Sequence, residues 1–170
     1  MKIENRVKWL TFTALFMSMN IVLSSFSIPV PGGHLYLNDV IICTAAIILD
    51  PLGAFIVGGV GAFLGDMIFY PAPMFVSLVT HGVQAVVISL CANRLFKNRE
   101  YIGAVVGVTL GAIIMVAGYT FGRAFIYSTV EYAIVKLPFQ FLQAIVGAVC
   151  GVILCYNVKL KDKFAKIALG

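Results

Sequence analysis

Polar side chains recur in pairs inside otherwise apolar stretches of this sequence. The pairs are His81 with Gln84, Tyr119 with Arg123, and Gln140 with Gln143. The two members of each pair are three or four residues apart, so they share one face wherever the segment is helical. Imidazole, amide, phenol and guanidinium groups donate or accept hydrogen bonds. Faces of this kind turn away from apolar surroundings, and together they predict a pocket for a small polar molecule.

The composition excludes an ordinary soluble domain. Hydrophobic residues make up 61% of the 170 residues and charged residues only 11%, whereas a soluble domain is about 45–50% apolar and about 25% charged. Lipid accommodates such a chain when helices satisfy the backbone hydrogen bonds internally. We therefore expect an all-α membrane protein in which residues 1–170 form a single domain.

Six apolar runs, separated by turn-forming residues, are the expected helices. They span about 9–28, 38–49, 52–70, 75–95, 101–121 and 137–156. Pro and Gly residues interrupt the chain after the first and third runs, and Asp50-Pro51 is a typical turn. The first run is too long for the apolar core of a signal peptide, so we expect a retained helix.

The distribution of positive charge predicts how these helices cross the membrane. Ten of the twelve basic residues form three groups: Lys2, Arg6 and Lys8; Arg94, Lys97 and Arg99; and Lys159, Lys161, Lys163 and Lys166. If all three groups are cytoplasmic, an even number of crossings separates them, and residues 38–70 cross twice. The expected fold is a compact bundle of six transmembrane helices with both termini in the cytoplasm. The outer loops are then 29–37, 71–74 and 122–136.

In this topology the polar residues gather at one depth. They lie at or near the outer ends of five helices: Asn38, Asp39, Asp66, Tyr70, His81, Gln84, Tyr119, Arg123, Gln140 and Gln143. The inner halves are nearly all apolar, apart from Asn93. The pattern predicts a cup that opens outward above an apolar floor, and not a continuous pore.

Several of these residues have a second, purely structural interpretation. Asp39 could serve only as a helix N-cap. Asp66 near a helix C-terminus opposes the helix dipole, so it either pairs with Arg123 or contacts ligand. His81 and Gln84 could bond neighbouring helices to one another, as could Gln140 and Gln143.

The outer loops contain further candidates. His34 and Tyr36 lie in the first outer loop, where they would contact the ligand if this loop is a lid. The alternative for Tyr36 is an aromatic side chain at the membrane interface. Glu131 and Lys136 are expected to be solvated charges of the third outer loop.

No motif for enzyme chemistry is present. The sequence contains no phosphate-binding G-x-x-x-x-G-K-[ST], no H-E-x-x-H and no G-x-S-x-G. Its four cysteines form no C-x-x-C pair, and its two histidines lie on different segments. We expect no enzyme activity, no resident metal or cofactor and no nucleic-acid partner.

The order of several short motifs resembles a known transporter family. The motifs are SIPVPGG (27–33), LND (37–39), DPLGA (50–54), GGVGAFLGD (58–66), HGVQ (81–84), MVAGY (115–119) and PFQFLQAIVG (138–147). Together they resemble the substrate-binding S components of energy-coupling factor (ECF) vitamin transporters, within the group that includes the hydroxymethylpyrimidine type.

This resemblance implies a six-helix protein of a prokaryotic plasma membrane that captures a water-soluble vitamin from outside, with the first outer loop as a lid. It implies a transmembrane T component and two ATPase subunits as partners, with ATP and Mg on those subunits, and a toppling motion that carries the ligand across. The family docks its T component through an A-x-x-x-A face on the first helix, which here corresponds to Ala14 and Ser18.

The residues favour a small hydroxylated heteroaromatic ligand of the hydroxymethylpyrimidine or pyridoxine type. His and Gln side chains supply hydrogen bonds and Tyr119 supplies a ring contact. Pantothenate or another vitamin is the alternative ligand, and an inward-facing Arg123 would favour an anion. A structural membrane protein without ligand, and a channel or carrier that works without ATPases, are the alternative classes; a lipid-modifying enzyme is the least supported.

Overall fold

The computed structural model describes residues 6–96 and 98–169, which are mostly helical. Five helical segments are long and apolar enough to cross a membrane: Arg6–Ser24, Pro51–Phe69, Met74–Leu95, Glu100–Tyr127 and Val130–Asn157. A shorter apolar helix spans Asn38–Ile48. Two of the cations used for the predicted topology, Lys2 and Lys97, lie outside the described residues.

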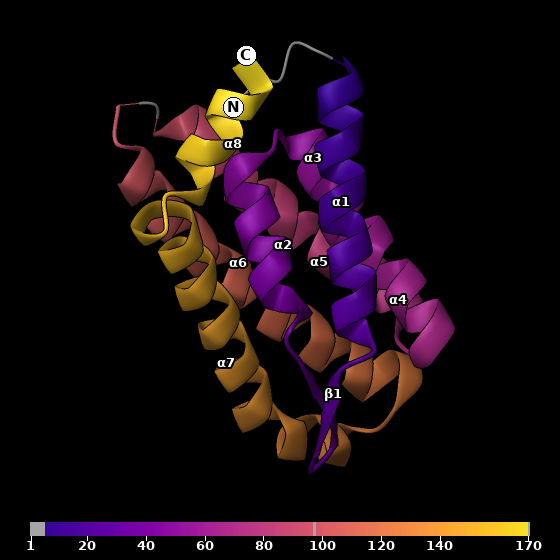
Figure 1. Cartoon of the computed structure of the whole chain (residues 1–170). Helices are drawn as coiled ribbons and strands as arrows, with labels where there is room; N and C mark the ends of the chain where they lie inside the picture. Colours follow the sequence, from indigo (N-terminus) through magenta and orange to yellow (C-terminus); the bar gives the residue numbers. More distant parts are fainter. Residues whose placement is uncertain (1–5, 97, 170) are drawn as a thin grey trace.

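The short helix α2 (Asn38–Ile48) forms the centre of the bundle (Figure 1). It packs against α1 (Arg6–Ser24), α5 (Met74–Leu90) and α7 (Val130–Val152). All but one of its residues are buried. A helix that is apolar on every side belongs in an interior, so α2 is the element around which the membrane-facing helices gather.

The chain reverses after α2 at the predicted Asp50-Pro51 turn. Pro51 opens α3 (Pro51–Phe55), where its missing N–H is not needed, and the helix continues through the π-helical turn η1 (Ile56–Val60) into α4 (Gly61–Phe69). The carbonyl of Leu49 accepts hydrogen bonds from Ser89 at 2.7 Å and Asn93 at 3.0 Å. Asn93, the polar exception in the inner half, therefore satisfies the backbone of this turn.

Three long helices complete the bundle, and each ends in a π-helical turn. The turns are η2 (Cys91–Leu95) after α5, η3 (Arg123–Tyr127) after α6 (Glu100–Gly122), and η4 (Ile153–Asn157) after α7. Glycines allow α7 to approach α2 closely: a Cβ on Gly147 would lie 2.6 Å from the Cβ of Asp39.

Two short strands occupy the segment that the sequence predicts to be an irregular first outer loop. β1 (Ser27–Val30) and β2 (Gly33–Tyr36) form an antiparallel hairpin in which Ser27 lies opposite Tyr36. Gly32 and Gly33 take φ values of 78° and 145° at the turn, which residues with a Cβ rarely adopt. The fold is therefore not purely α-helical.

The predicted outer loop over 122–136 is wrong. The helical segment that begins at Glu100 continues to Tyr127 and α7 begins at Val130, so only Ser128 and Thr129 connect them. Pro138 lies inside α7, although proline removes a hydrogen bond from a helix interior. Arg123 and Lys136 are consequently helical and buried, and Lys136 is not a solvated loop charge.

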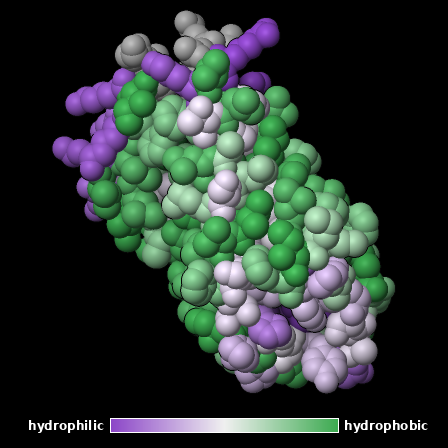
Figure 2. All heavy atoms as spheres, turned by 45° about the vertical axis from the view of Figure 1, so that its right-hand side comes forward, coloured by the Kyte–Doolittle hydropathy of each residue, from purple (hydrophilic) through white to green (hydrophobic). Residues whose placement is uncertain are grey.

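The lysine-rich tail forms an eighth helix, α8 (Leu160–Leu169). The ring of Phe164 packs against the rings of Phe12 and Phe16, with centroids 4.8 and 5.2 Å apart. Figure 1 shows α8 at the opposite end of the bundle from the hairpin. Figure 2 shows polar surface at both of these ends and a hydrophobic belt between them, as a membrane requires.

Candidate functional site

A cavity lies at the hairpin end of the bundle, beneath β2. Its lining combines charged, amide and aromatic groups: His34, Tyr36, Asn38, Asp66, Tyr70, Pro73, His81, Tyr119, Arg123, Tyr127, Lys136, Gln140 and Gln143. The free space inside is about 30 Å³, enough for about two water molecules. A ring-sized ligand would therefore require the residues around the cavity to move apart.

Nine of the eleven predicted pocket residues line this cavity: His34, Tyr36, Asn38, Asp66, His81, Tyr119, Arg123, Gln140 and Gln143. The other two, Asp39 and Gln84, lie directly behind it and hold the lining residues in place. Residues from the hairpin, α2, α4, α5, α6, η3 and α7 thus meet at one depth.

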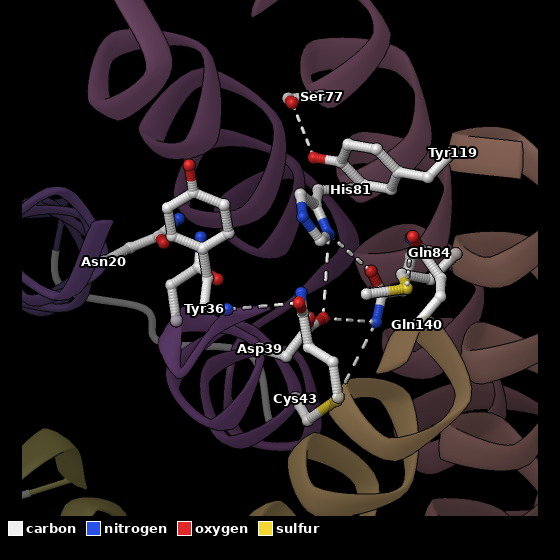
Figure 3. A network of polar contacts seen from close by, with 12 residues as sticks. Asn20, Tyr36, Asp39, Cys43, Ser77, His81, Gln84, Tyr119 and Gln140 are labelled. Atoms are coloured by element: carbon white, nitrogen blue, oxygen red, sulfur yellow. Dashed lines mark hydrogen bonds and ion pairs between the residues drawn. The ribbon is translucent and has the colours of Figure 1, made fainter. Parts of the chain in front are cut away.

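Asp39 is the centre of a buried hydrogen-bond network (Figure 3). Its Oδ1 accepts from Gln84 Nε2 at 3.1 Å, and its Oδ2 accepts from Gln143 Nε2 at 2.7 Å. The Nδ1 of His81 lies 3.7 Å from Asp39 Oδ1. These contacts join α2, α5 and α7. They also give the carboxylate of Asp39, which is only 1% exposed, the hydrogen-bond partners that a buried polar group needs.

The same network fixes the orientation of His81. Because Gln84 donates through Nε2 to Asp39, its Oε1 remains as the acceptor facing His81 Nδ1 at 2.6 Å. An amide oxygen only accepts hydrogen bonds, so His81 carries a proton on Nδ1. The imidazole also packs edge-on against Tyr119, with ring centroids 5.1 Å apart.

A second group of contacts surrounds Asp66 of α4. Ser77 of α5 donates to Asp66 Oδ2 and also contacts the hydroxyl of Tyr119 at 2.5 Å. The predicted alternative of an Asp66–Arg123 salt bridge does not occur among the described residues. Arg123 instead donates from Nη1 to the carbonyl of Gly32 in the hairpin at 2.6 Å.

The hairpin is attached to the cavity by side chains from α7. Gln143 Oε1 accepts from the backbone N–H of Tyr36 at 3.1 Å, and Lys136 Nζ donates to the carbonyl of His34 at 2.6 Å. Burial, followed by the nearby Asp66 carboxylate, raises the pKa of Tyr36 above its usual value. Its hydroxyl therefore stays protonated and available as a donor.

Three polar residues that interact with the site were not predicted to do so: Ser77, Tyr127 and Lys136. Tyr70 was placed at the correct depth but was not assigned to the pocket, which it lines. Each of these residues lies four residues from a predicted one, which places it on the same helix face. Extending the polar face of α7 by one turn, from Gln140 back to Lys136, would have found the buried lysine.

Four buried polar atoms that belong to cavity-lining residues have no hydrogen-bond partner within the described chain. They are His34 Nδ1, Asn38 Oδ1, Arg123 Nε and the hydroxyl oxygen of Tyr127. Buried polar groups are almost always hydrogen-bonded. Their convergence on one cavity indicates a binding site that a ligand would complete.

The predicted docking residues lie elsewhere, on the outward face of α1. Ala14 and Ser18 are both exposed, and Ser18 Oγ donates to the carbonyl of Ala14 at 2.7 Å. The adjacent Leu15 and Met19 are 48% and 42% exposed. This face therefore remains available for lipid or for another membrane protein.

An apolar helical bundle with a polar, aromatic-lined cavity at one end defines a membrane protein that binds a small solute. The family of ECF-type riboflavin transporter S components matches residues 4–160. The chain belongs to this family, and it is therefore a multi-pass protein of a prokaryotic plasma membrane and a transporter subunit, not an enzyme.

Individual relatives agree with this assignment. The thiamine precursor transporter HmpT of Lactococcus lactis subsp. cremoris is 31% identical over 156 residues, covering 89% of this chain and 87% of HmpT. A Pyrococcus woesei protein without an assigned activity is 31% identical over 134 residues, covering 78% of this chain and 88% of that protein.

A solved structure of the S component of a bacterial ECF transporter has the same fold. The match has a TM-score of 0.72 at 19% sequence identity and covers 91% of this chain and 97% of the other. At this identity the match supports the fold alone.

Proposed function

We propose that this S component binds a water-soluble vitamin or vitamin precursor of the hydroxymethylpyrimidine or pyridoxine type. The observation that carries the proposal is the cavity itself, where tyrosine and histidine rings lie beside amide and charged groups. Aromatic rings contact a flat heterocycle through its faces and edges, while Gln140, Gln143 and His81 supply hydrogen bonds to its substituents. The name of the relative HmpT, a thiamine precursor transporter, supports the same ligand class.

The cavity opens to the outside in the orientation that we propose. Six crossings, with α2 as the short second one, would leave both termini and the Asn98 connection in the cytoplasm. The support is the positive charge of Arg94, Arg99 and the α8 lysines, which lies at the end opposite the hairpin. The β1–β2 hairpin would then be the lid over an extracytoplasmic site.

Transport would require partner subunits. In the proposed complex a T component docks on the exposed α1 face that contains Ala14 and Ser18, where small side chains allow close helix approach. Two ATPase subunits would supply ATP and Mg, and this chain would topple to release its ligand. Serine departs from the family's second alanine but keeps the face small, so close helix approach remains possible.

Binding measurements on the isolated full chain test the ligand assignment. The small molecule that co-purifies would be identified by mass spectrometry, and hydroxymethylpyrimidine, pyridoxine, pantothenate and riboflavin would then be titrated. We expect micromolar or tighter binding of a hydroxymethylpyrimidine- or pyridoxine-type ligand. His81→Ala should weaken it about tenfold, the effect of one lost hydrogen bond. Gln84→Ala should weaken it indirectly, because His81 Nδ1 loses the acceptor that fixes its orientation.

The matched control is Ile113→Ala, at a 61% exposed position of α6, which should leave affinity unchanged. Tight binding of pantothenate alone would favour the alternative ligand. The proposal would be overturned if no vitamin bound more tightly than millimolar and His81→Ala changed only the stability. That result would favour a structural protein.

A further inference from the structure

Two positively charged side chains face the cavity from neighbouring helical segments. Arg123 of η3 is 9% exposed and Lys136 of α7 is 2% exposed. Within the described chain neither forms a salt bridge with a carboxylate. Burying a charge without an opposite charge is unfavourable, so this part of the cavity would stabilise a negatively charged group.

Both cations meet beneath the turn of the hairpin. Arg123 donates to the carbonyl of Gly32 and Lys136 to the carbonyl of His34, each at 2.6 Å. A Cβ on Gly33 would lie 2.9 Å from Arg123 Nη1, and one on Gly32 would lie 2.9 Å from Lys136 Cβ. The glycines therefore bring one short stretch of backbone against both cations, and a single ligand group could contact the two together.

The cations retain unused donors. Each hydrogen bond to the hairpin engages one N–H, whereas a guanidinium and an ammonium carry several. Arg123 Nε is buried and has no hydrogen-bond partner. Its guanidinium also lies over the ring of Tyr127, with Cζ 5.3 Å from the centroid, which holds the planar group in a fixed direction.

The carboxylates of the site lie on other elements. Asp66 of α4 accepts from Ser77, and Asp39 of α2 accepts from Gln84 and Gln143. The cavity is therefore lined by charges of both signs that are not paired with each other: Arg123 and Lys136 bond the hairpin, and Asp66 bonds Ser77. A neutral ligand would form no ion pair with these charged side chains.

We infer that the ligand carries an anionic group, bound by Arg123 and Lys136, on a heterocycle whose donor-bearing edge faces Asp66. A phosphate monoester of the vitamin or precursor fits best, because both cations can share its oxygens. This inference rests on the proposed vitamin-binding function and narrows it to the phosphorylated form.

Matched ligand pairs test it by calorimetry on the full chain. Pyridoxine is compared with pyridoxine 5′-phosphate, and hydroxymethylpyrimidine with its phosphate. The phosphate ester should bind at least about tenfold more tightly than the alcohol, and Lys136→Met should remove this advantage, since a charge-assisted hydrogen bond changes affinity by about ten- to a hundredfold. Binding of the alcohol should weaken by a smaller factor, because both ligands feel the loss of the Lys136 contact to the hairpin but only the ester also loses a charge-assisted hydrogen bond.

Further variants separate charge from stability. Lys136→Arg should retain most of the preference for the ester, and Lys166→Met, which removes an exposed cation of α8, should change nothing. If Lys136→Met does not fold, Arg123→Gln replaces it. Competition of the ester by pantothenate and by inorganic phosphate distinguishes a general anion site from a phosphate-ester site.

Two outcomes would overturn the inference while leaving the proposed function intact: the alcohol binds as tightly as its ester, or Lys136→Met weakens both ligands equally. If pantothenate binds preferentially, Arg123 and Lys136 bind the carboxylate of the ligand, and the proposal of a phosphate ester is rejected. If no member of either pair binds, the vitamin-binding function fails instead.

Discussion

Asp39 and Gln143 show how single residues connect the lid to the bundle. Gln143 donates to Asp39 Oδ2 at 2.7 Å and accepts from the backbone of Tyr36 at 3.1 Å. One amide thus joins α7 to both α2 and β2. The position of the hairpin is coupled in this way to the carboxylate behind the cavity.

Gln143→Leu should both destabilise the protein and loosen the hairpin. The substitution leaves one oxygen of a buried carboxylate without its donor, and losing a hydrogen bond to a charged group costs about 2 kcal/mol. A lower melting temperature in detergent and faster amide exchange over residues 27–36 would show this. Leu142→Ala, one residue away and 51% exposed, is the control; equal effects in both variants would contradict the coupling.

Helix-face spacing was sufficient to predict most of the residues around the cavity. The pairs at 81/84 and 140/143 already defined faces pointing inward. Lys136 was missed because residues 123–136 were interpreted as a polar connection, whereas its ammonium group is held by a backbone carbonyl of the hairpin. A contact between residues 102 positions apart leaves no signal in local spacing.

At the scale of elements, the approach of α7 to α2 depends on Gly147. A Cβ there would lie 2.6 Å from Asp39 Cβ and 3.2 Å from its backbone carbon. These atoms belong to a buried helix and cannot rotate aside. Glycine is required because the two helices touch at this position.

Gly147→Ala should therefore separate α7 from α2 and weaken the Gln143–Asp39 contact one turn away. Overpacking of this kind destabilises by about 1–3 kcal/mol, measurable as a lower melting temperature together with weaker ligand binding. Val149→Ile adds a single carbon at a 51% exposed position of the same helix and should be neutral. A wild-type melting temperature for Gly147→Ala would argue against a tight α2–α7 contact.

The order of the apolar helices could be predicted from the runs of apolar residues, but not where each helix ends. Residues 123–136 alternate between cavity-facing polar side chains and exposed apolar ones such as Phe125 and Ile134. The average polarity of these residues is typical of a loop. In the structure, however, the polar face of the helix lies against the cavity and its apolar face is on the outside of the bundle. The hairpin was also missed, because one proline inside the four-residue strand β1 and a second directly after it oppose pairing, and the tertiary contacts of β2 overcome this.

At the scale of the whole molecule, the two polar ends differ in kind. The α8 end carries exposed lysines, and the hairpin end carries the cavity. A membrane protein retains positively charged segments on the cytoplasmic side. The difference in positive charge between the two ends predicts that the chain inserts into the membrane in a single orientation.

Cysteine labelling checks this orientation. In a variant whose native cysteines are replaced, Ser128→Cys should react with an impermeant maleimide on intact cells, because Ser128 is exposed at the cavity end. Asn98→Cys, exposed at the other end, should react only after permeabilisation. The reverse pattern, or labelling of both positions in intact cells, would contradict the proposed topology.

The shortness of α2 has an electrical consequence. Its eleven residues span about 16 Å, roughly half the thickness of a bilayer's hydrocarbon core, about 30 Å. In the proposed orientation, and once the hairpin opens the cavity to water, most of the membrane voltage would fall across the length of α2, between the bound solute and the cytosol. A captured anion would reach the bottom of the cup after crossing only a fraction of the field, and the remaining electrical work would fall to the ATP-driven step.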